Sequence, residues 1–221
     1  MMRLSAFTPL ALLAFVLTLA SPALAQKRGG PAGEFDFYVL ALSWSAGFCE
    51  VEGDAKGREQ CAKGKGLGFV VHGLWPQNER GYPVECGPQG RSPSRAAMDI
   101  ARDVYPDEGL ARYQWRKHGT CAGTSPTEYF SAAKQARQRV VIPAAFTKPS
   151  ADSTWNPAVI ERAFSESNAG LRADMMSVTC RRGILNEVRI CLTRDLRNFR
   201  TCGEVSRDGC STREIKAPAV R

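Results

Sequence analysis

The pattern of apolar and polar residues, either continuous apolar runs or alternation, predicts four principal strands. Residues 35–44 (FDFYVLALSW) are a nearly continuous aromatic and β-branched run, which is typical of a strand covered on both faces. Residues 67–72 predict a second strand, in which Val70 and His72 lie on one face. Residues 175–182 and 184–193 predict a strand pair around a glycine, because the second segment alternates with a partial period of two.

Four further segments predict helices, at residues 94–104, 110–118, 125–141 and 156–167. Ser125 and Glu128 have capping-box spacing, with Pro126 at the first helical position of the third helix. We expect Gly119 to end the second helix. Asn156, followed by a proline, is expected to begin the fourth.

The segments between these elements predict loops. Residues 26–33 are expected to be a flexible lead-in, and residues 49–66 and 77–94 to be surface loops. No internal repeat is visible. Helices and strands that are partly segregated along the chain indicate an α+β fold, with a central antiparallel sheet and several helices packed on it.

The first 25 residues have the features of a signal peptide. Arg3 supplies a positive charge, residues 10–19 are apolar but too short to cross a bilayer, and Ala23 and Ala25 place small residues at a cleavage site. We expect cleavage before Gln26, which leaves residues 26–221 as a single exported domain. A retained membrane anchor is disfavoured because the apolar stretch is short.

Composition narrows the class of protein further. Among 221 residues, 43% are hydrophobic and 30 Lys and Arg face 22 Asp and Glu, so wholesale disorder is excluded. Residues 171–221 carry most of the positive excess. Such charge suits a polyanionic partner, but a solvated basic surface is an equally good interpretation.

Eight cysteines lie beyond residue 25. An even number in an exported chain indicates four disulfides formed in an oxidising compartment, although eight cysteines allow 105 connectivities. The chain has no Asn-x-Ser/Thr acceptor site for glycosylation. This favours a bacterial periplasm over a eukaryotic secretory route, so we expect a periplasmic or secreted protein.

The whole chain has two histidines, His72 and His118. One neutral imidazole can accept a proton while a second, protonated one donates a proton. Cleavage of RNA by its own 2′-OH needs this division of labour, because the nucleophile is already attached to the substrate. DNA lacks that hydroxyl and should be inert. So few histidines also leave little room for a histidine-rich metal site.

The predicted helix 110–118 brings further polar groups to His118. Gln114, Lys117 and His118 are spaced i, i+3 and i+4, so they project from one face. Lys117 can stabilise negative charge on phosphate oxygens, and Gln114 can donate an amide hydrogen bond. Trp115 lies nearly opposite, and we expect it in the core.

The segments HGLWP (72–76) and WRKHGTC (115–121) resemble the two active-site segments of the ribonuclease T2 family. The resemblance implies that family's fold and an endoribonuclease that cleaves single-stranded RNA through a 2′,3′-cyclic phosphate. It implies that His118 is the general base, that His72 is the general acid and that Lys117 stabilises the transition state. Trp75 matches a tryptophan that stacks on a base. Gln77 follows the first segment directly and is a candidate base-edge contact.

Two positions depart from the family pattern, which usually has His-Glu before the tryptophan of the second segment. Here Tyr113 cannot carry a positive charge and Gln114 cannot act as a carboxylate. We still expect activity, because the acid, the base and the lysine are present. The alternative is a catalytically silent RNA-binding or cell-surface-binding protein on the same fold.

The resemblance also implies a disulfide pattern. The implied pairs are Cys49 with Cys61, Cys86 with Cys121, Cys180 with Cys210 and Cys191 with Cys202. The second pair would tie the loop after His72 to the end of the His118 helix.

Two minor alternatives use Cys121 as a thiolate. The first is a zinc site with His118, and the second is a thiol hydrolase. We expect neither of them. The expected protein needs no metal or other cofactor, acts as a monomer and has single-stranded RNA as its partner, without a membrane anchor.

Overall fold

The computed structural model describes residues 27–86 and 92–221. The predicted signal peptide and its cleavage site before Gln26 lie outside these residues, as does part of the predicted loop 77–94. No helix within the described ranges is long and apolar enough to cross a membrane.

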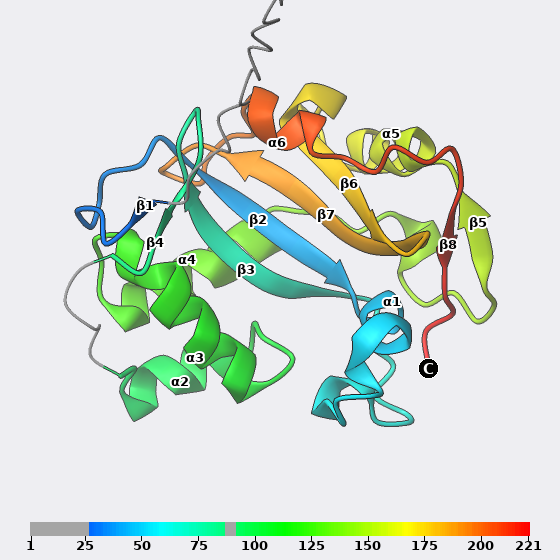
Figure 1. Ribbon diagram of the computed structural model, residues 1–221, viewed down its shortest axis with the longest axis horizontal. Coiled ribbons are helices and arrows are strands. Elements are labelled where there is room, and N and C mark those ends of the chain that lie inside the picture. The colour runs from blue at the N-terminus through cyan, green and yellow to red at the C-terminus, as the bar shows by residue number, and fades with distance from the viewer. Residues whose placement is uncertain (1–26, 87–91) are drawn as a thin grey trace, which may run out of the picture.

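A mixed sheet forms the centre of the molecule (Figure 1). Four strands are antiparallel neighbours in the order β3 (Phe69–Gln77), β2 (Phe37–Trp44), β7 (Ile184–Leu192) and β6 (Met176–Arg181). β8 (Ile215–Ala217) joins β7 in parallel through one residue pair and is antiparallel to β5 (Ser153–Trp155). A separate parallel pair joins β1 (Lys27–Arg28) to β4 (Pro83–Val84). β1 lies within the lead-in 26–33 that we expected to be flexible, and β4 lies within the predicted loop 77–94.

β2 is buried along its whole length, as its sequence predicts. Its neighbours β3 and β7 satisfy its backbone on both edges. Leu40 and Leu42 point into the main hydrophobic core, whereas Phe37 and Val39 belong to a smaller cluster on the opposite face. The alternation of the strand therefore divides the molecule into a core face and a second face, which carries the pocket described below.

β3 continues beyond the predicted end at His72 to Gln77. The glycine and proline of the first motif argue against a strand, but Pro76 is tolerated because β3 is at the edge of the sheet. The register shifts within the motif, since Ala41 pairs with Gly73 and Leu42 with Val71. His72 is therefore the extra residue of a β-bulge.

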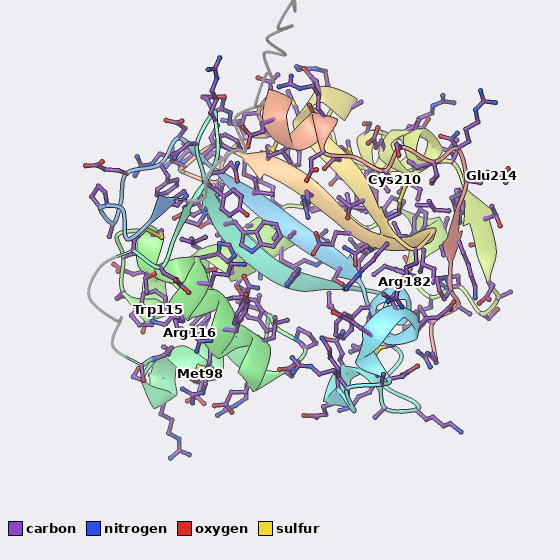
Figure 2. All side chains as sticks on the ribbon, viewed as in Figure 1. Met98, Trp115, Arg116, Arg182, Cys210 and Glu214 are labelled. Atoms are coloured by element: carbon purple, nitrogen blue, oxygen red, sulfur yellow. A yellow bond between two sulfur atoms is a disulfide. The ribbon has the colours of Figure 1, made fainter. Side chains whose placement is uncertain are left out.

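Three helices pack together beside β3, namely α2 (Arg95–Arg102), α3 (Glu108–Lys117) and α4 (Pro126–Gln138). α5 (Pro157–Ser167) and the short α6 (Gly203–Arg207) pack against β6. The four predicted helices are confirmed, with the capping box of Ser125 and Glu128 in place. Figure 2 shows Met98 on α2 and Trp115 on α3, both of which are buried in the core.

The segment 49–66 differs from the predicted loop. It follows a short helix α1 (Ser45–Phe48) and itself contains a π-helical turn (Cys49–Gly53) and a 3₁₀ turn (Glu59–Cys61). Further 3₁₀ turns occupy Gly119–Cys121, Ala144–Phe146 and Ala173–Met175. Elements this short leave too little periodicity in the sequence to be predicted.

Four disulfides staple these elements, and they are the pairs that the family resemblance implies. The Cys86–Cys121 bond connects the segment after β4 to the turn after α3. The Cys191–Cys202 bond connects the end of β7 to the start of α6. The second bond thereby ties α6 to β7, a strand that borders the pocket.

Candidate active site

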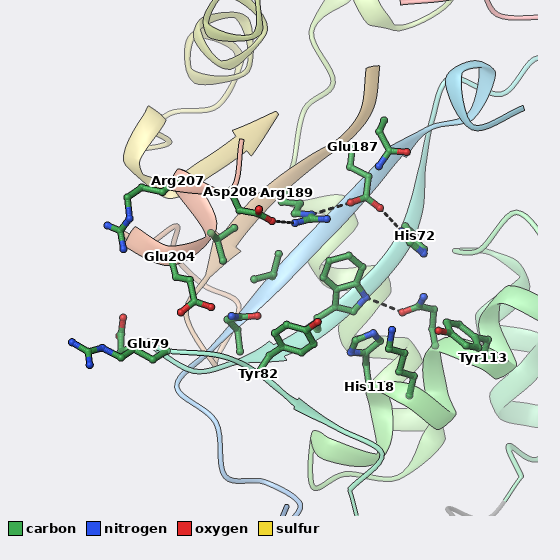
Figure 3. Close-up of a pocket in the computed structure, with 18 residues that line it drawn as sticks. His72, Glu79, Tyr82, Tyr113, His118, Glu187, Arg189, Glu204, Arg207 and Asp208 are labelled. Carbon is green, nitrogen blue, oxygen red and sulfur yellow. Dashed lines mark hydrogen bonds and ion pairs between the residues drawn. The ribbon is translucent and has the colours of Figure 1, made fainter. Parts of the chain in front are cut away.

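A pocket of about 980 Å³ lies over the second face of the sheet. Its walls come from β2, β3 and β7, from the end of α3, from α6 and from the loop after β3. Both histidines line it (Figure 3). Two histidines that lie 46 positions apart in the sequence therefore meet in one cavity.

The bulge at His72 is what allows both His72 and Trp75 of β3 to face this pocket. Phe69 and Val71 before it, and Leu74 after it, all contribute to the core. Without an extra residue, alternation would place His72 on the same face as Leu74, because both positions are even-numbered. The bulge resets the alternation, so His72 and Trp75 both reach the pocket.

Gly73 leaves room for the contact that organises the centre of the pocket. A β-carbon at this position would collide with the Trp75 indole nitrogen and the Gln114 side-chain oxygen. These two atoms form a hydrogen bond of 2.8 Å, with the indole N–H as donor. The bond links β3 to α3, so a side chain at residue 73 would separate the two motifs.

His72 is paired with a buried carboxylate. Its Nδ1 hydrogen-bonds to Glu187 Oε1 on β7, and its side chain remains 35% exposed. Glu187 Oε2 accepts a hydrogen bond of 2.9 Å from Arg189 Nε. Burial raises the pKa of Glu187, but its bonds and charge interactions with His72 and Arg189 outweigh burial and hold that pKa below its ordinary value.

His118 occupies a different environment. It is the C-terminal cap of α3, is only 5% exposed, and its Nδ1 has no hydrogen-bond partner among the described residues. Burial, followed by the positive charges of Lys117 and His72, lowers its pKa to about 3. The buried ring is therefore neutral at neutral pH and can accept a proton.

Gly119 follows this histidine for a reason other than the predicted one. The helix does end before it, but the glycine opens a 3₁₀ turn and is not in the left-handed conformation. A β-carbon here would collide with the rings of Trp115 and Tyr129. Close packing against the core requires the glycine, and this packing holds His118 at the pocket wall.

Trp75 lies between the two imidazoles. Its ring stacks on His118 with centroids 5.3 Å apart and meets His72 edge-on at 5.4 Å. The guanidinium carbon of Arg189 lies 5.5 Å from the indole centroid. The indole ring therefore contacts both imidazoles and separates them.

Lys117 and Tyr113 of α3 line the pocket together with His118. The Lys117 ammonium lies 5.7 Å from the centre of the Tyr113 ring, and the Arg116 guanidinium lies 5.6 Å from it on the same helix. Tyr113 is 41% exposed. The last turn of α3 therefore carries two positive charges, Arg116 and Lys117, next to the buried histidine.

Gln77 lines the other end of the pocket, where it is buried. Its amide nitrogen donates to the carbonyl of Gly81 at 3.1 Å. The Gly81 amide in turn donates to the Glu204 carboxylate, at 3.0 Å from both oxygens. The loop after β3 is thereby held against α6.

The alternatives based on a Cys121 thiolate are excluded. Cys121 is bonded to Cys86, and all eight cysteines are in disulfides. Within the described ranges, the one close group of potential metal ligands is Cys49, Asp54 and Cys61, and its two sulfurs are bonded to each other. Neither cysteine pair offers a thiolate to a metal or a substrate.

Comparison with known proteins agrees with this geometry. The model of the ribonuclease T2 family matches residues 35–202, well over half of the 221-residue chain. The chain belongs to the ribonuclease T2 family. Its membership supports endoribonuclease activity on RNA.

Individual relatives of this ribonuclease T2 protein are found in bacteria and plants. It is 34% identical over 187 residues to a ribonuclease of Aeromonas hydrophila, covering 81% of this chain and 82% of that protein. It is 28% identical over 209 residues to ribonuclease I of Escherichia coli, covering 75% and 78%. The RNase-related protein from Calystegia sepium shares the fold, with a TM-score of 0.68 at 22% identity over 85% of this chain and 99% of that one.

The two departures from the ribonuclease T2 pattern have different consequences. Gln114 is 1% exposed, and its oxygen is engaged by Trp75, which leaves its amide nitrogen to donate. No described residue accepts from that nitrogen. Tyr113 keeps a hydroxyl at the pocket edge but brings no charge.

Glu187 and Arg189 are pocket residues that the sequence motifs do not include. They lie at alternate positions of β7, with opposite charges, on the face opposite to the core residues Val188 and Ile190. A pair of opposite charges two residues apart in an otherwise apolar strand is a signal that could have indicated them.

Most basic side chains of residues 171–221 are engaged in contacts within the protein. Most of these side chains pair with carboxylates or carbonyls, namely Arg172, Arg181, Arg189, Arg194, Arg197, Arg200, Lys216 and Arg221. Of the basic side chains in residues 171–221, only Arg189 and Arg207 line the pocket. The structure therefore favours a solvated basic surface over a continuous polyanion-binding tract.

Proposed function

We propose that this protein cleaves single-stranded RNA by attack of a ribose 2′-OH on the adjacent phosphate. His118 takes the proton of the 2′-OH while a bond forms between the 2′-oxygen and phosphorus. His72 gives its proton to the 5′-oxygen as the bond between that oxygen and phosphorus breaks. The products are a 2′,3′-cyclic phosphate and a free 5′-OH.

The unequal surroundings of the two histidines carry this proposal. A base must begin neutral, and burial without a partner for Nδ1 keeps His118 uncharged. An acid must begin charged, and the Glu187 carboxylate at Nδ1 of His72 stabilises an imidazolium. The two rings are thus suited to the two proton transfers of the reaction, one as acceptor and the other as donor.

Lys117 and Gln114 are the proposed stabilisers of the pentacoordinate phosphate. The ammonium of Lys117 lies at the pocket mouth and can neutralise charge that develops on the non-bridging oxygens. The amide nitrogen of Gln114 can donate a hydrogen bond to the same oxygens, without serving as an acid.

Trp75, Tyr113 and Gln77 are the proposed substrate-binding residues. Trp75 is held by Gln114 and His118 and offers an aromatic surface to a base. Tyr113 can hydrogen-bond a phosphate, and Gln77 can present its amide oxygen to a base edge. A flat aromatic platform accepts any base, so these contacts support broad sequence tolerance.

Export, metal independence and a monomeric state belong to the same proposal. The signal-peptide features and the four disulfides support an oxidising compartment, the periplasm or the extracellular medium. An acid, a base and a lysine supply the proton transfers and charge that the reaction requires, so no metal ion is needed in the step.

The deciding experiment incubates the purified protein with a single-stranded RNA oligonucleotide in EDTA. We expect cleavage with 2′,3′-cyclic phosphate ends, and none at a linkage whose ribose carries 2′-hydrogen. His118→Ala protein prepared in parallel controls for a contaminating ribonuclease. Intact RNA that still binds would contradict the proposal and indicate the catalytically silent binder instead.

A further inference from the structure

Glu187 is the most deeply buried carboxylate in the pocket. It is 3% exposed, yet its pKa lies below the ordinary value, so it is ionised. An ionised carboxylate is costly to bury unless it is paired and hydrogen-bonded. Both of its oxygens are occupied, one by His72 and the other by Arg189.

The sheet allows the contact between His72 and Glu187 because small residues lie between them. His72 is on β3 and Glu187 on β7, and β2 separates these strands. Neighbouring strands are about 4.8 Å apart, so two long side chains can bridge the middle strand only over small residues. Ala41 and Ser43 of β2 pair with Arg189 and Glu187, and they provide that space.

Few other charges act on His72. From β7 it faces Glu187 directly and Arg189 through that carboxylate. From the end of α3 it faces His118, which is neutral, and Lys117. Arg189 is in turn held by Asp208 at 2.7 Å, as Figure 3 shows. Glu187 is therefore the negative charge in direct contact with the imidazole.

We propose that Glu187 is the positioning residue for the general acid. It binds the Nδ1–H of His72, which directs Nε2 toward the departing 5′-oxygen and stabilises the charged ring before the proton leaves. Glu187 stays ionised throughout, and His72 becomes neutral as the proton passes from Nε2 to oxygen. This inference rests on the proposed function, since it deepens the part played by His72.

The carboxylate has a role that an amide of equal size cannot fill. Glutamine at this position could still accept a hydrogen bond from Nδ1, so the ring orientation would largely survive. Its lack of charge would leave the imidazolium stabilised by nothing but dipoles. Charge and shape can therefore be separated in one variant.

The test compares Glu187→Gln with the matched control Glu161→Gln. Glu161 is a half-buried carboxylate on α5 that accepts from the Val178 amide and does not line the pocket. Because the chain has two histidines, ¹⁵N labelling of histidine resolves both imidazoles by NMR without RNA. Their titrations are followed in both variants, together with pH profiles of kcat and kcat/KM.

In Glu187→Gln, we expect the His72 titration and the alkaline limb of kcat/KM to move to lower pH by about one to three units. We expect kcat to fall about 100-fold or more at neutral pH while KM changes little, in the manner of a residue that orients a catalytic histidine. Glu161→Gln should leave both midpoints and the rate unchanged.

Two results would overturn the inference. The first is a Glu187→Gln protein that is folded and in which the His72 titration does not move. The second is a fall in rate with an unmoved alkaline limb, which is the signature of a purely structural role. The NMR titration is read without substrate, so it holds even if RNA is not cleaved, and the two proposals can fail separately.

Discussion

The two histidines of this protein have the same side chain and opposite surroundings. His72 lies in a bulge of β3, is partly exposed and is paired with an ionised carboxylate. His118 ends α3, is buried and has no described partner at Nδ1. A carboxylate favours the charged ring and burial favours the neutral one. The fold thereby gives two identical side chains opposite electrostatic surroundings.

The environments of the two histidines are built from different parts of the fold. The surroundings of His72 are made by three strands, through a pairing that the chain achieves only when β2, β3 and β7 are assembled. The surroundings of His118 are made where the end of α3 and the following turn pack against Tyr129 of α4 and Trp75 of β3. Changes to either environment should therefore affect one half of the reaction more than the other.

The largest expected effect separates acid from base. His72→Ala and His118→Ala should each lower kcat/KM on RNA by several orders of magnitude, since each removes a proton-transfer group that also orients the reaction. With an aryl ester of a nucleoside 3′-phosphate, whose leaving group needs no proton, His72→Ala should recover most activity and His118→Ala should not. Steady-state rates on both substrates measure this.

Equal recovery of both variants on the aryl ester would contradict the assignment of roles. Recovery by His118→Ala alone would reverse it.

Lys117→Met should lower kcat by about 100- to 1000-fold, the cost of removing one donor that stabilises a transition state. The methionine keeps the unbranched stem beside Tyr113, so packing changes little. KM should change less than kcat if the charge acts on the transition state. Lys134→Met is the matched control, because Lys134 forms an exposed ion pair with Asp103 outside the pocket. A variant at position 117 with nearly full kcat would contradict the proposed role.

Burial of neutral His118 should make the protein sensitive to acid. Its pKa is about 3 in the folded state against 6.5 for the free side chain, so within this window only the unfolded chain binds the extra proton. The contribution of neutral His118 to the free energy of unfolding is therefore fully present above pH 6.5. It falls as the pH is lowered from there, by at most about 1.4 kcal/mol per pH unit. Thermal unfolding at several pH values measures the slope.

His118→Gln supplies the comparison, because an amide does not titrate. Between pH 6.5 and 4.5 the stability of His118→Gln should decline less than that of the natural protein. This pH range is chosen because it lies above the free-state pKa of Glu187. Parallel slopes in the two proteins would show that residue 118 is not buried neutral.

The smallest effect concerns Gln114. Gln114→Leu removes the hydrogen bond from the Trp75 indole and the proposed amide donor together, and should lower kcat/KM about 10-fold. Gln114→Glu keeps an acceptor for Trp75 but replaces the amide donor with a charge that repels phosphate. Activity of Gln114→Glu at or above that of the natural protein would show that the amide is not a donor to phosphate.

Much of the framework was predictable because it depends on local patterns. The apolar run of β2, the capping box of α4 and the β6–β7 pair all follow from residues close together in the chain. Elements of two or three residues, such as β5 and β8, were missed because they exist only where a neighbouring strand accepts them. The turns within 49–66 were missed for a similar reason.

The sequence by itself determined the chemical inventory: two histidines in two distinctive motifs, a lysine beside one of them, and cysteines for four disulfides. Only the tertiary structure decided how these groups differ. Whether an imidazole is charged depends on its burial and on charges within a few ångströms, and Glu187 lies 115 residues from His72 along the chain. Side chains from distant strands become neighbours only after folding, which is why the partner of His72 could not be found in its own motif.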